Sequence, residues 1–222
     1  MPLCLYAFVA FVALTSDHRM VQHTRINLSL PMRHCLIFVL LAALLGSMPK
    51  LAGAQSDAAA WQALTAPGER AVVVLFRHAN APGTGDPAGF KLGDCSSQRN
   101  LDAAGRSQAR RIGEQFKFRN VQVKRVLSSA WCRCQETATL AFGGPAEKAP
   151  AFNSFFEDAY NAEAQTAAAS AQLLAWRGPG VLVAVTHQVN ITALTGLTVS
   201  AGEGVVLSNS SGKLSIVSRL IP

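Results

Sequence analysis

Residues 71–78 read AVVVLFRH, a continuous run of β-branched and apolar residues that ends in an arginine and a histidine. A run without polar alternation is typical of a strand buried on both faces, as in a parallel sheet. Residues 181–187, VLVAVTH, show the same pattern, and residues 121–127 form a third strand candidate that ends at Ser128 and Ser129. The sequence therefore predicts a sheet whose main strands run parallel.

Helical patterns separate these strands. In residues 103–118 the apolar side chains fall on one face, residues 163–176 are rich in alanine, and a third helix is expected over residues 188–195. Residues 202–220 resemble a hairpin around a polar turn. Strands that alternate with helices favour an α/β fold, which we expect to be a three-layer α/β/α sandwich with a mostly parallel central sheet.

The segment before the first strand has the three parts of a secretory signal. A short basic start at residues 32–34 leads into an apolar run, and a small-residue site follows at residues 52–54. We expect cleavage after Ala54, a folded domain over residues 55–222, and a periplasmic or secreted location. The apolar run is shorter than the roughly 20 residues that span a bilayer, and an uncleaved tether is the alternative. Residues 1–31 are interpreted as an extension of the gene model.

Length, composition and charge limit the possible functions. The chain has 222 residues, of which 50% are apolar and 15% charged, which excludes a disordered or low-complexity chain. Its formal net charge of +7 falls to +4 without residues 1–54, because four of the 20 basic residues and one of the 13 acidic residues lie there. The remaining basic residues are scattered, so nucleic-acid binding is not expected. A modest positive charge suits a small anionic substrate.

Three cysteines lie in the expected mature domain, namely Cys95, Cys132 and Cys134. In an oxidising compartment one disulfide is expected, and it would join Cys95 either to Cys132 or to Cys134. The spacing leaves this choice open, and we take Cys95 with Cys134 as the working prediction. The Cys and His spacing of structural zinc sites is absent, so no metal is expected.

The same domain has two histidines, His78 and His187, and each closely follows one of the two most apolar strands. In open α/β sheets ligands bind at the carboxyl ends of the strands. Arg77 precedes His78, and Arg133 follows the third strand, so both should lie at this edge. Arginine binds phosphate oxygens through paired N–H groups, and a neutral imidazole is a nucleophile toward phosphorus. These four residues therefore predict a pocket for a phosphoryl group, with two purely structural histidines as the alternative.

Four segments, in order, resemble the motifs of the histidine phosphatase superfamily, which has the phosphoglycerate-mutase-like fold. Residues 75–79, LFRHA, resemble its Arg-His-Gly signature, and residues 101–109, LDAAGRSQA, resemble the start of one of its helices. Residues 128–138 resemble its Ser-Ser-x-x-x-Arg-x-x-x-Thr-Ala segment, and residues 185–187 resemble the strand that delivers its second histidine. The resemblance indicates a small, exported branch of this family.

The resemblance implies roles for individual residues. His78 would be the nucleophile that becomes phosphohistidine. Arg77, Arg133 and His187 would bind the phosphoryl group, and His187 would also belong to the catalytic set.

A carboxylic acid normally protonates the leaving oxygen in this family. The acid-phosphatase branch has aspartate after the second histidine, whereas here Gln188 follows. The acid is therefore expected in a loop after the second arginine, where Glu157 is the first choice and Asp158 the second. Glu136 is a third option, although it lies in an expected helix.

Two departures from the family pattern concern the active site. Ala79 replaces the glycine of the first motif, which matters only if the backbone there needs a positive φ. Residues 80–100 form a long Gly/Pro-rich insertion, and loops of this length are usually functional or mobile. We expect the insertion to border the site, with Asn80 and Arg99 as candidate substrate contacts. Asn190, one helical turn beyond the second histidine, is a third candidate.

These features predict an exported phosphomonoesterase that works through a phosphohistidine intermediate, without a metal or other cofactor, on a small phosphorylated substrate. A phosphomutase is one alternative, which export disfavours because phosphorylated glycolytic intermediates are cytosolic. A non-catalytic phosphate- or phosphoglycan-binding module on the same fold is the other. No stable membrane anchor is expected after cleavage. No residue specifies the substrate or the oligomeric state.

Overall fold

The computed structural model describes residues 52–66, 71–210 and 212–222. The expected gene-model extension (1–31) and nearly all of the expected signal (32–54) lie outside these residues. The predicted cleavage site after Ala54 falls in the first turn of α3 (Ala52–Thr65). None of the described helices is long and apolar enough to cross a membrane.

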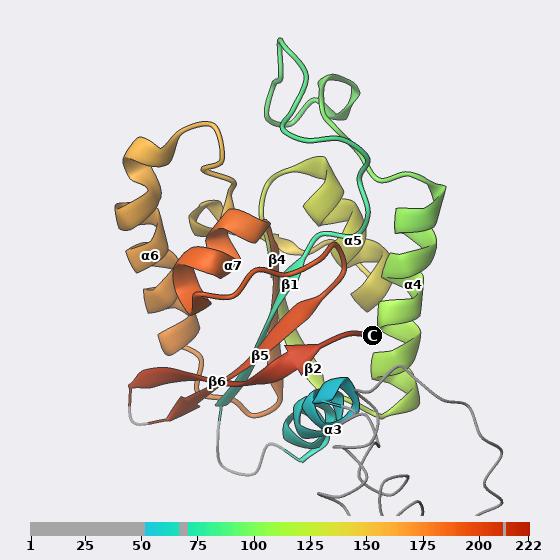
Figure 1. The fold of residues 1–222 in the computed structure, drawn as a ribbon, viewed down its shortest axis with the longest axis vertical. Coiled ribbons are helices and arrows are strands. Elements are labelled where there is room, and N and C mark those ends of the chain that lie inside the picture. The colour runs from blue at the N-terminus through green and yellow to red at the C-terminus, as the bar shows by residue number, and fades with distance from the viewer. Residues whose placement is uncertain (1–51, 67–70, 211) are drawn as a thin grey trace, which may run out of the picture. The chain divides into compact units, whose positions relative to one another are not determined.

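A single sheet of six strands forms the centre of the described part (Figure 1). Its order is β3-β2-β4-β1-β5-β6. The two apolar runs become the central strands β1 (Ala71–Arg77) and β4 (Val181–Thr186), which pair in parallel with Arg77 opposite Thr186. The other strands are β2 (Val123–Ser128), β3 (Glu147–Lys148), β5 (Gly204–Ser210) and β6 (Lys213–Leu220).

Helices cover both faces of the sheet, so the predicted three-layer α/β/α sandwich is confirmed (Figure 1). Side chains of β1 alternate between the two cores, with Val72, Val74 and Phe76 on one side and Val73 and Leu75 on the other. The first core is closed by α3, α4 (Ala103–Phe118) and α5 (Cys132–Phe142), the second by α6 (Ala162–Leu174), α7 (Gln188–Thr195) and the short 3-10 helix η2 (Pro150–Phe152).

The sheet is parallel across β3, β2, β4 and β1, and the closing hairpin adds β5 and β6 in antiparallel orientation. This confirms a mostly parallel sheet. Two details differ from the sequence prediction. The third strand begins at Val123 and not at residue 121. The edge strand β3 was not predicted, because two exposed charged residues carry no strand pattern.

Helices α4 and α5 approach each other at Gly113. A Cβ atom at this position would lie 2.0 Å from the carbonyl oxygen of Ala141 in α5. The close approach brings Phe116 of α4 against Phe142 of α5, with ring centroids 5.3 Å apart. Since α5 begins next to Arg133, this contact helps to place the start of α5 at the sheet edge.

We predict that Gly113→Ala destabilises the protein by about 1–3 kcal/mol, because the added methyl group overpacks a rigid backbone contact. At an ordinary exposed helix position the same change would stabilise the fold, since alanine has the higher helix propensity. Ser107→Ala on the exposed side of α4 is the matched control and should change stability little. Urea unfolding midpoints measure both; a Gly113→Ala variant at least as stable as the parent contradicts the contact.

Candidate active site

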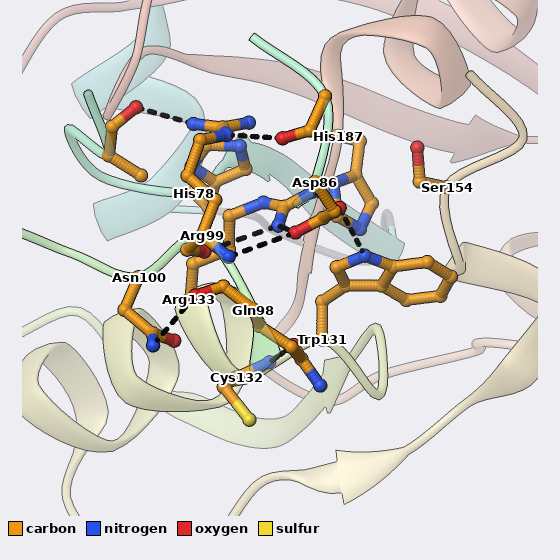
Figure 2. Close-up of polar contacts among 12 residues, drawn as sticks. His78, Asp86, Gln98, Arg99, Asn100, Trp131, Cys132, Arg133, Ser154 and His187 are labelled. Atoms are coloured by element: carbon orange, nitrogen blue, oxygen red, sulfur yellow. Dashed lines mark hydrogen bonds and ion pairs between the residues drawn. The ribbon is translucent and has the colours of Figure 1, made fainter. Parts of the chain in front are cut away.

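The parallel pairing of β1 with β4 brings the two histidines together. The His78 backbone N–H donates to the Thr186 carbonyl oxygen over 3.0 Å, so both chains leave the sheet at the same edge. The rings of His78 and His187 meet edge to face, with centroids 5.5 Å apart. Figure 2 shows both histidines near Asp86 and Arg133, so the strand-end pattern correctly brings the two rings together.

Local contacts set the tautomer of His78. Its Nδ1 lies 2.8 Å from the Ala79 carbonyl oxygen, which can only accept, so Nδ1 carries the hydrogen and Nε2 keeps its lone pair. Burial lowers the pKa of His78 to about 3, against the opposing hydrogen bond to Ala79 and with a further contribution from nearby arginines. The neutral imidazole therefore persists at neutral pH with a free Nε2.

His187 is held in the same cavity by different partners. Its Nε2 lies 2.8 Å from the Ser129 Oγ and 3.5 Å from the Cys134 Sγ. Complete burial, followed by the proximity of His78 and Arg133, holds its pKa well below the usual range. Its ring also meets the Trp131 ring edge to face at 5.3 Å.

Three guanidinium groups surround the histidines. Arg77 ends β1 and donates from Nη1 to the Val199 carbonyl oxygen over 3.0 Å and to Gln188 Oε1 over 3.3 Å. Arg133 lies in the first turn of α5 with its side chain 3% exposed. The third is Arg99 of the insertion, whose side chain donates to the carbonyl oxygens of residues 85 and 81. Burial, and then Arg133, lowers the pKa of Arg77 and of Arg99.

Two of these cations keep an unused hydrogen-bond donor. The Nε atoms of Arg77 and Arg133 are buried and have no hydrogen-bond partner among the described residues. A buried donor without a partner costs about 1–3 kcal/mol, and charged donors cost more. Both arginines line the cavity described below, and a buried donor without a partner is a feature often found at functional sites.

Asp86, which is not among the residues predicted from the sequence, lies beside Arg99 and Arg133 (Figure 2). Its Oδ1 accepts from Arg133 Nη1 over 2.7 Å and its Oδ2 from Arg133 Nη2 over 3.1 Å. The Trp131 indole N–H also donates to Oδ2, and the Arg99 backbone N–H donates to Oδ1. Burial alone would raise the pKa of Asp86, but these hydrogen bonds outweigh it and lower the pKa. Asp86 is the single acid of the Pro82–Pro87 turn, yet its partner lies 47 residues away, so local pattern could not reveal the pair.

All these groups line one cavity of about 480 Å³. Glu157 and Asp158 lie on its wall, and Glu157 Oε1 accepts from the Asp86 backbone N–H over 3.3 Å. Glu136, the third acid candidate, is not in the lining and forms an ion pair with Arg106 at 2.6 Å. Phe90 stacks on Trp131 at 5.2 Å and adds an aromatic wall.

The three residues predicted to contact substrate differ in their positions relative to the cavity. Arg99 lines the cavity, whereas Asn80 and Asn190 do not. The Asn80 side chain donates to Asp102, the N-cap of α4. Asn190 is buried and donates to the Asn153 carbonyl oxygen over 2.8 Å. Both side-chain amides thus contact other parts of the chain outside the cavity lining, and their expected contact with substrate stays a prediction.

Ala79 is accommodated without strain. Asn120 is the only non-glycine among the described residues with a positive φ, so Ala79 is not in the conformation that would require glycine. Its backbone N–H donates to the Thr137 hydroxyl over 3.0 Å.

The disulfide joins Cys95 to Cys132, so the working prediction of Cys95 with Cys134 was wrong. Residues two apart on a helix point to nearly opposite sides. Cys132 at the start of α5 faces the insertion, while Cys134 turns inward toward His187 and is fully buried. Burial raises the pKa of the Cys134 thiol to about 12. In the part of the chain that the structure describes, no group of three or more His, Cys, Asp and Glu side chains could hold a metal ion.

Comparisons with known proteins agree with this arrangement. Residues 73–178 match the family model described as "Histidine phosphatase superfamily (branch 1)". The chain belongs to the histidine phosphatase superfamily. The matched residues include Arg77, His78 and Arg133. His187 lies after the end of the match, and the structure places it against His78. Among curated proteins none matches the sequence.

Solved structures of this superfamily share the fold. A candidate alpha-ribazole-5'-P phosphatase from Escherichia coli K-12 aligns with a TM-score of 0.51 at 18% identity, covering 67% of this chain and 96% of that one. A candidate phosphohistidine phosphatase SixA from Nakamurella multipartitia aligns with a TM-score of 0.50 at 15% identity, covering 70% and 98%. At these identities the likeness extends to the phosphoglycerate-mutase-like fold alone.

Burial of neutral His78 predicts a pH-dependent stability. The unfolded chain binds a proton near pH 6.5 and the folded chain only near pH 3, so stability is lost as the pH falls through this window. One such group contributes up to about 1.4 kcal/mol per pH unit. Chemical unfolding between pH 7 and about pH 5, where carboxylates stay ionised, should show a shallower loss for His78→Asn than for the parent. Equal slopes would contradict a neutral His78.

Proposed function

We propose that this histidine phosphatase superfamily member is a phosphomonoesterase that works through a phosphohistidine on His78. One observation carries the proposal: the free Nε2 of a neutral, buried imidazole faces a cavity that contains three guanidinium groups. Guanidinium groups stabilise the negative charge of a phosphoryl group in the transition state. Two buried arginine Nε donors without partners fit the oxygens of that group.

The first half-reaction transfers the phosphoryl group to the enzyme. His78 Nε2 attacks phosphorus, the N–P bond forms, and the bond from phosphorus to the ester oxygen breaks. The leaving oxygen takes a proton from the carboxyl group of Glu157, and the alcohol departs. In the second half-reaction water attacks phosphorus, gives a proton to the Glu157 carboxylate, and the N–P bond breaks to release phosphate.

His187 and the arginines would hold the phosphoryl group during both steps. Its buried ring lies beside the attacking imidazole and contacts Ser129, which keeps it in place. Arg77 and Arg133 approach from β1 and α5, and Arg99 from the insertion. The proposal needs no metal or other cofactor, because the arginines supply the positive charge.

Glu157 is preferred as the acid because it lines the cavity and contacts the backbone of residue 86. Asp158 also lines the cavity, but its carboxylate accepts from the Tyr160 backbone N–H and from the Asn161 side chain. These bonds hold Asp158 as a cap of the 3-10 helix η3 (Ala159–Asn161). Glu136 faces Arg106 away from the cavity.

Export forms part of the proposal. The signal-like residues 32–54 support a periplasmic or secreted enzyme. The Cys95–Cys132 disulfide is consistent with an oxidising compartment. The substrate would be a small phosphate ester that fits a cavity of about 480 Å³.

His78→Ala should lower kcat/KM for an aryl phosphate by about a thousandfold or more, because the covalent route is lost. Brief reaction with a 32P-labelled ester should give the parent an acid-labile, base-stable protein label and leave the variant unlabelled. Far-UV circular dichroism checks that the variant folds. Hydrolysis by the parent without any such label would contradict the intermediate. A parent protein that neither hydrolyses the ester nor takes up label would favour a binding module.

Glu157→Gln should lower kcat for alkyl phosphates by about 10²–10⁴-fold, because these leaving groups need a proton. Aryl phosphates with acidic leaving groups should be much less affected. Glu136→Gln removes the same charge outside the cavity and is the matched control, with activity near that of the parent. If Asp158→Asn and not Glu157→Gln shows the selective loss, the acid has been assigned to the wrong residue.

A further inference from the structure

Arg133 can bind a phosphoryl group through its paired Nη atoms only if those atoms are free. In the structure both already donate to one carboxylate, that of Asp86. We propose that Asp86 is an internal anion that occupies the phosphoryl position on Arg133, so that the substrate must displace it. This inference rests on the proposed function, because it assumes that the cavity binds phosphate esters.

The contacts of Asp86 are those that a phosphoryl group would make. Two oxygens accept a fork from Arg133, one also accepts from the Trp131 indole N–H over 2.9 Å, and the other from the Arg99 backbone N–H over 3.1 Å. The Asp86 side chain is only 8% exposed. Arginine forks onto carboxylate and phosphate with the same geometry. The site therefore accepts either anion, but Arg133 cannot present the same fork to both.

The electrostatics favour an occupied site. Three arginines converge on one cavity, and each lowers the pKa of His78 through its charge. Of the three carboxylates on the cavity wall, Asp86 forms an ion pair with Arg133, and without that pair the repulsion among these cations would grow. Asp86 neutralises one of the three charges when no ligand is bound. A phosphate dianion supplies more charge and can also accept from the unpartnered Nε atoms of Arg77 and Arg133, which Asp86 leaves unused.

The turn that carries Asp86 lies outside the sheet. Gly83 and Gly85 precede it with φ values of +92° and +68°, in the region that glycine enters most readily. Residues 82–84 are exposed, and the turn has no regular secondary structure. Withdrawal of the carboxylate from Arg133 would rotate this turn at its glycines and break the bonds from Arg99 to the carbonyl oxygens of residues 81 and 85.

The competing explanation is that Asp86 only positions Arg133 for substrate. The two roles predict opposite effects of removing the charge. An internal competitor raises the apparent dissociation constant, which equals the intrinsic value divided by the fraction of molecules whose site is open. If Asp86 fills the site about nine-tenths of the time, its removal tightens anion binding about tenfold. If Asp86 positions Arg133, its removal weakens binding.

The test is calorimetric titration of the full mature domain with tungstate and with inorganic phosphate. Asp86→Asn should bind both about tenfold more tightly than the parent. Asp94→Asn is the matched control, because Asp94 lies in the same insertion, is exposed, and caps the 3-10 helix η1 (Cys95–Ser97) without contacting Arg133. Its dissociation constants should equal those of the parent. Arg133→Ala should lose binding.

The outcomes separate this inference from the proposed function. Unchanged or weaker binding by Asp86→Asn, with binding by the parent intact, overturns the internal anion and leaves the phosphatase proposal standing. No binding of either anion by the parent and by Asp86→Asn overturns both.

A measurement on the parent covers the case in which the variant does not fold. Displacement of Asp86 breaks its bond with the Trp131 indole N–H, so saturating tungstate should shift that indole resonance in a ¹H–¹⁵N spectrum. The chain has three tryptophans, and Trp131→Phe identifies the resonance. An indole signal that stays in place at saturation overturns displacement.

Discussion

The parallel register between β1 and β4 places both histidines. Arg77 pairs with Thr186, so the next residue of each strand leaves the sheet at the same level and on the same edge. Both strands are buried on both faces, which fixes their register because a slip would move every side chain into the opposite core. The imidazole pair is therefore supported by the most deeply buried part of the molecule.

That position determines the chemistry of the rings. Their burial disfavours protonation, and the surrounding arginines disfavour it further, so the rings stay neutral beside three guanidinium groups. The same burial makes the guanidinium groups costly to assemble without an anion. A site that can bind a phosphoryl group therefore requires a counter-ion when no ligand is bound. Asp86 supplies that negative charge through its ion pair with Arg133.

The strands and the strand-end histidines can be predicted from sequence because each is encoded by neighbouring residues. The run 71–76 has no polar alternation, and His78 follows it directly. The ion pair of Asp86 with Arg133 depends on how the insertion of residues 80–100 folds back over α5, which no local pattern records. The choice of Cys132 over Cys134 likewise depends on which side of α5 faces that insertion. The errors in the predicted site therefore arise from contacts between segments that are distant in sequence.

The crosslink between Cys95 and Cys132 divides the insertion into two parts and ties it to the start of α5. Arg99 follows the crosslink and lies in the short connection to α4, so it is anchored from both directions. Asp86 precedes the crosslink, in the part attached to β1 at one end and to the sulfur bridge at the other. The two parts also hold each other, because the Arg99 side chain donates to the carbonyl oxygens of Gly85 and Ala81, so a shift of the part that carries Asp86 would loosen Arg99 as well.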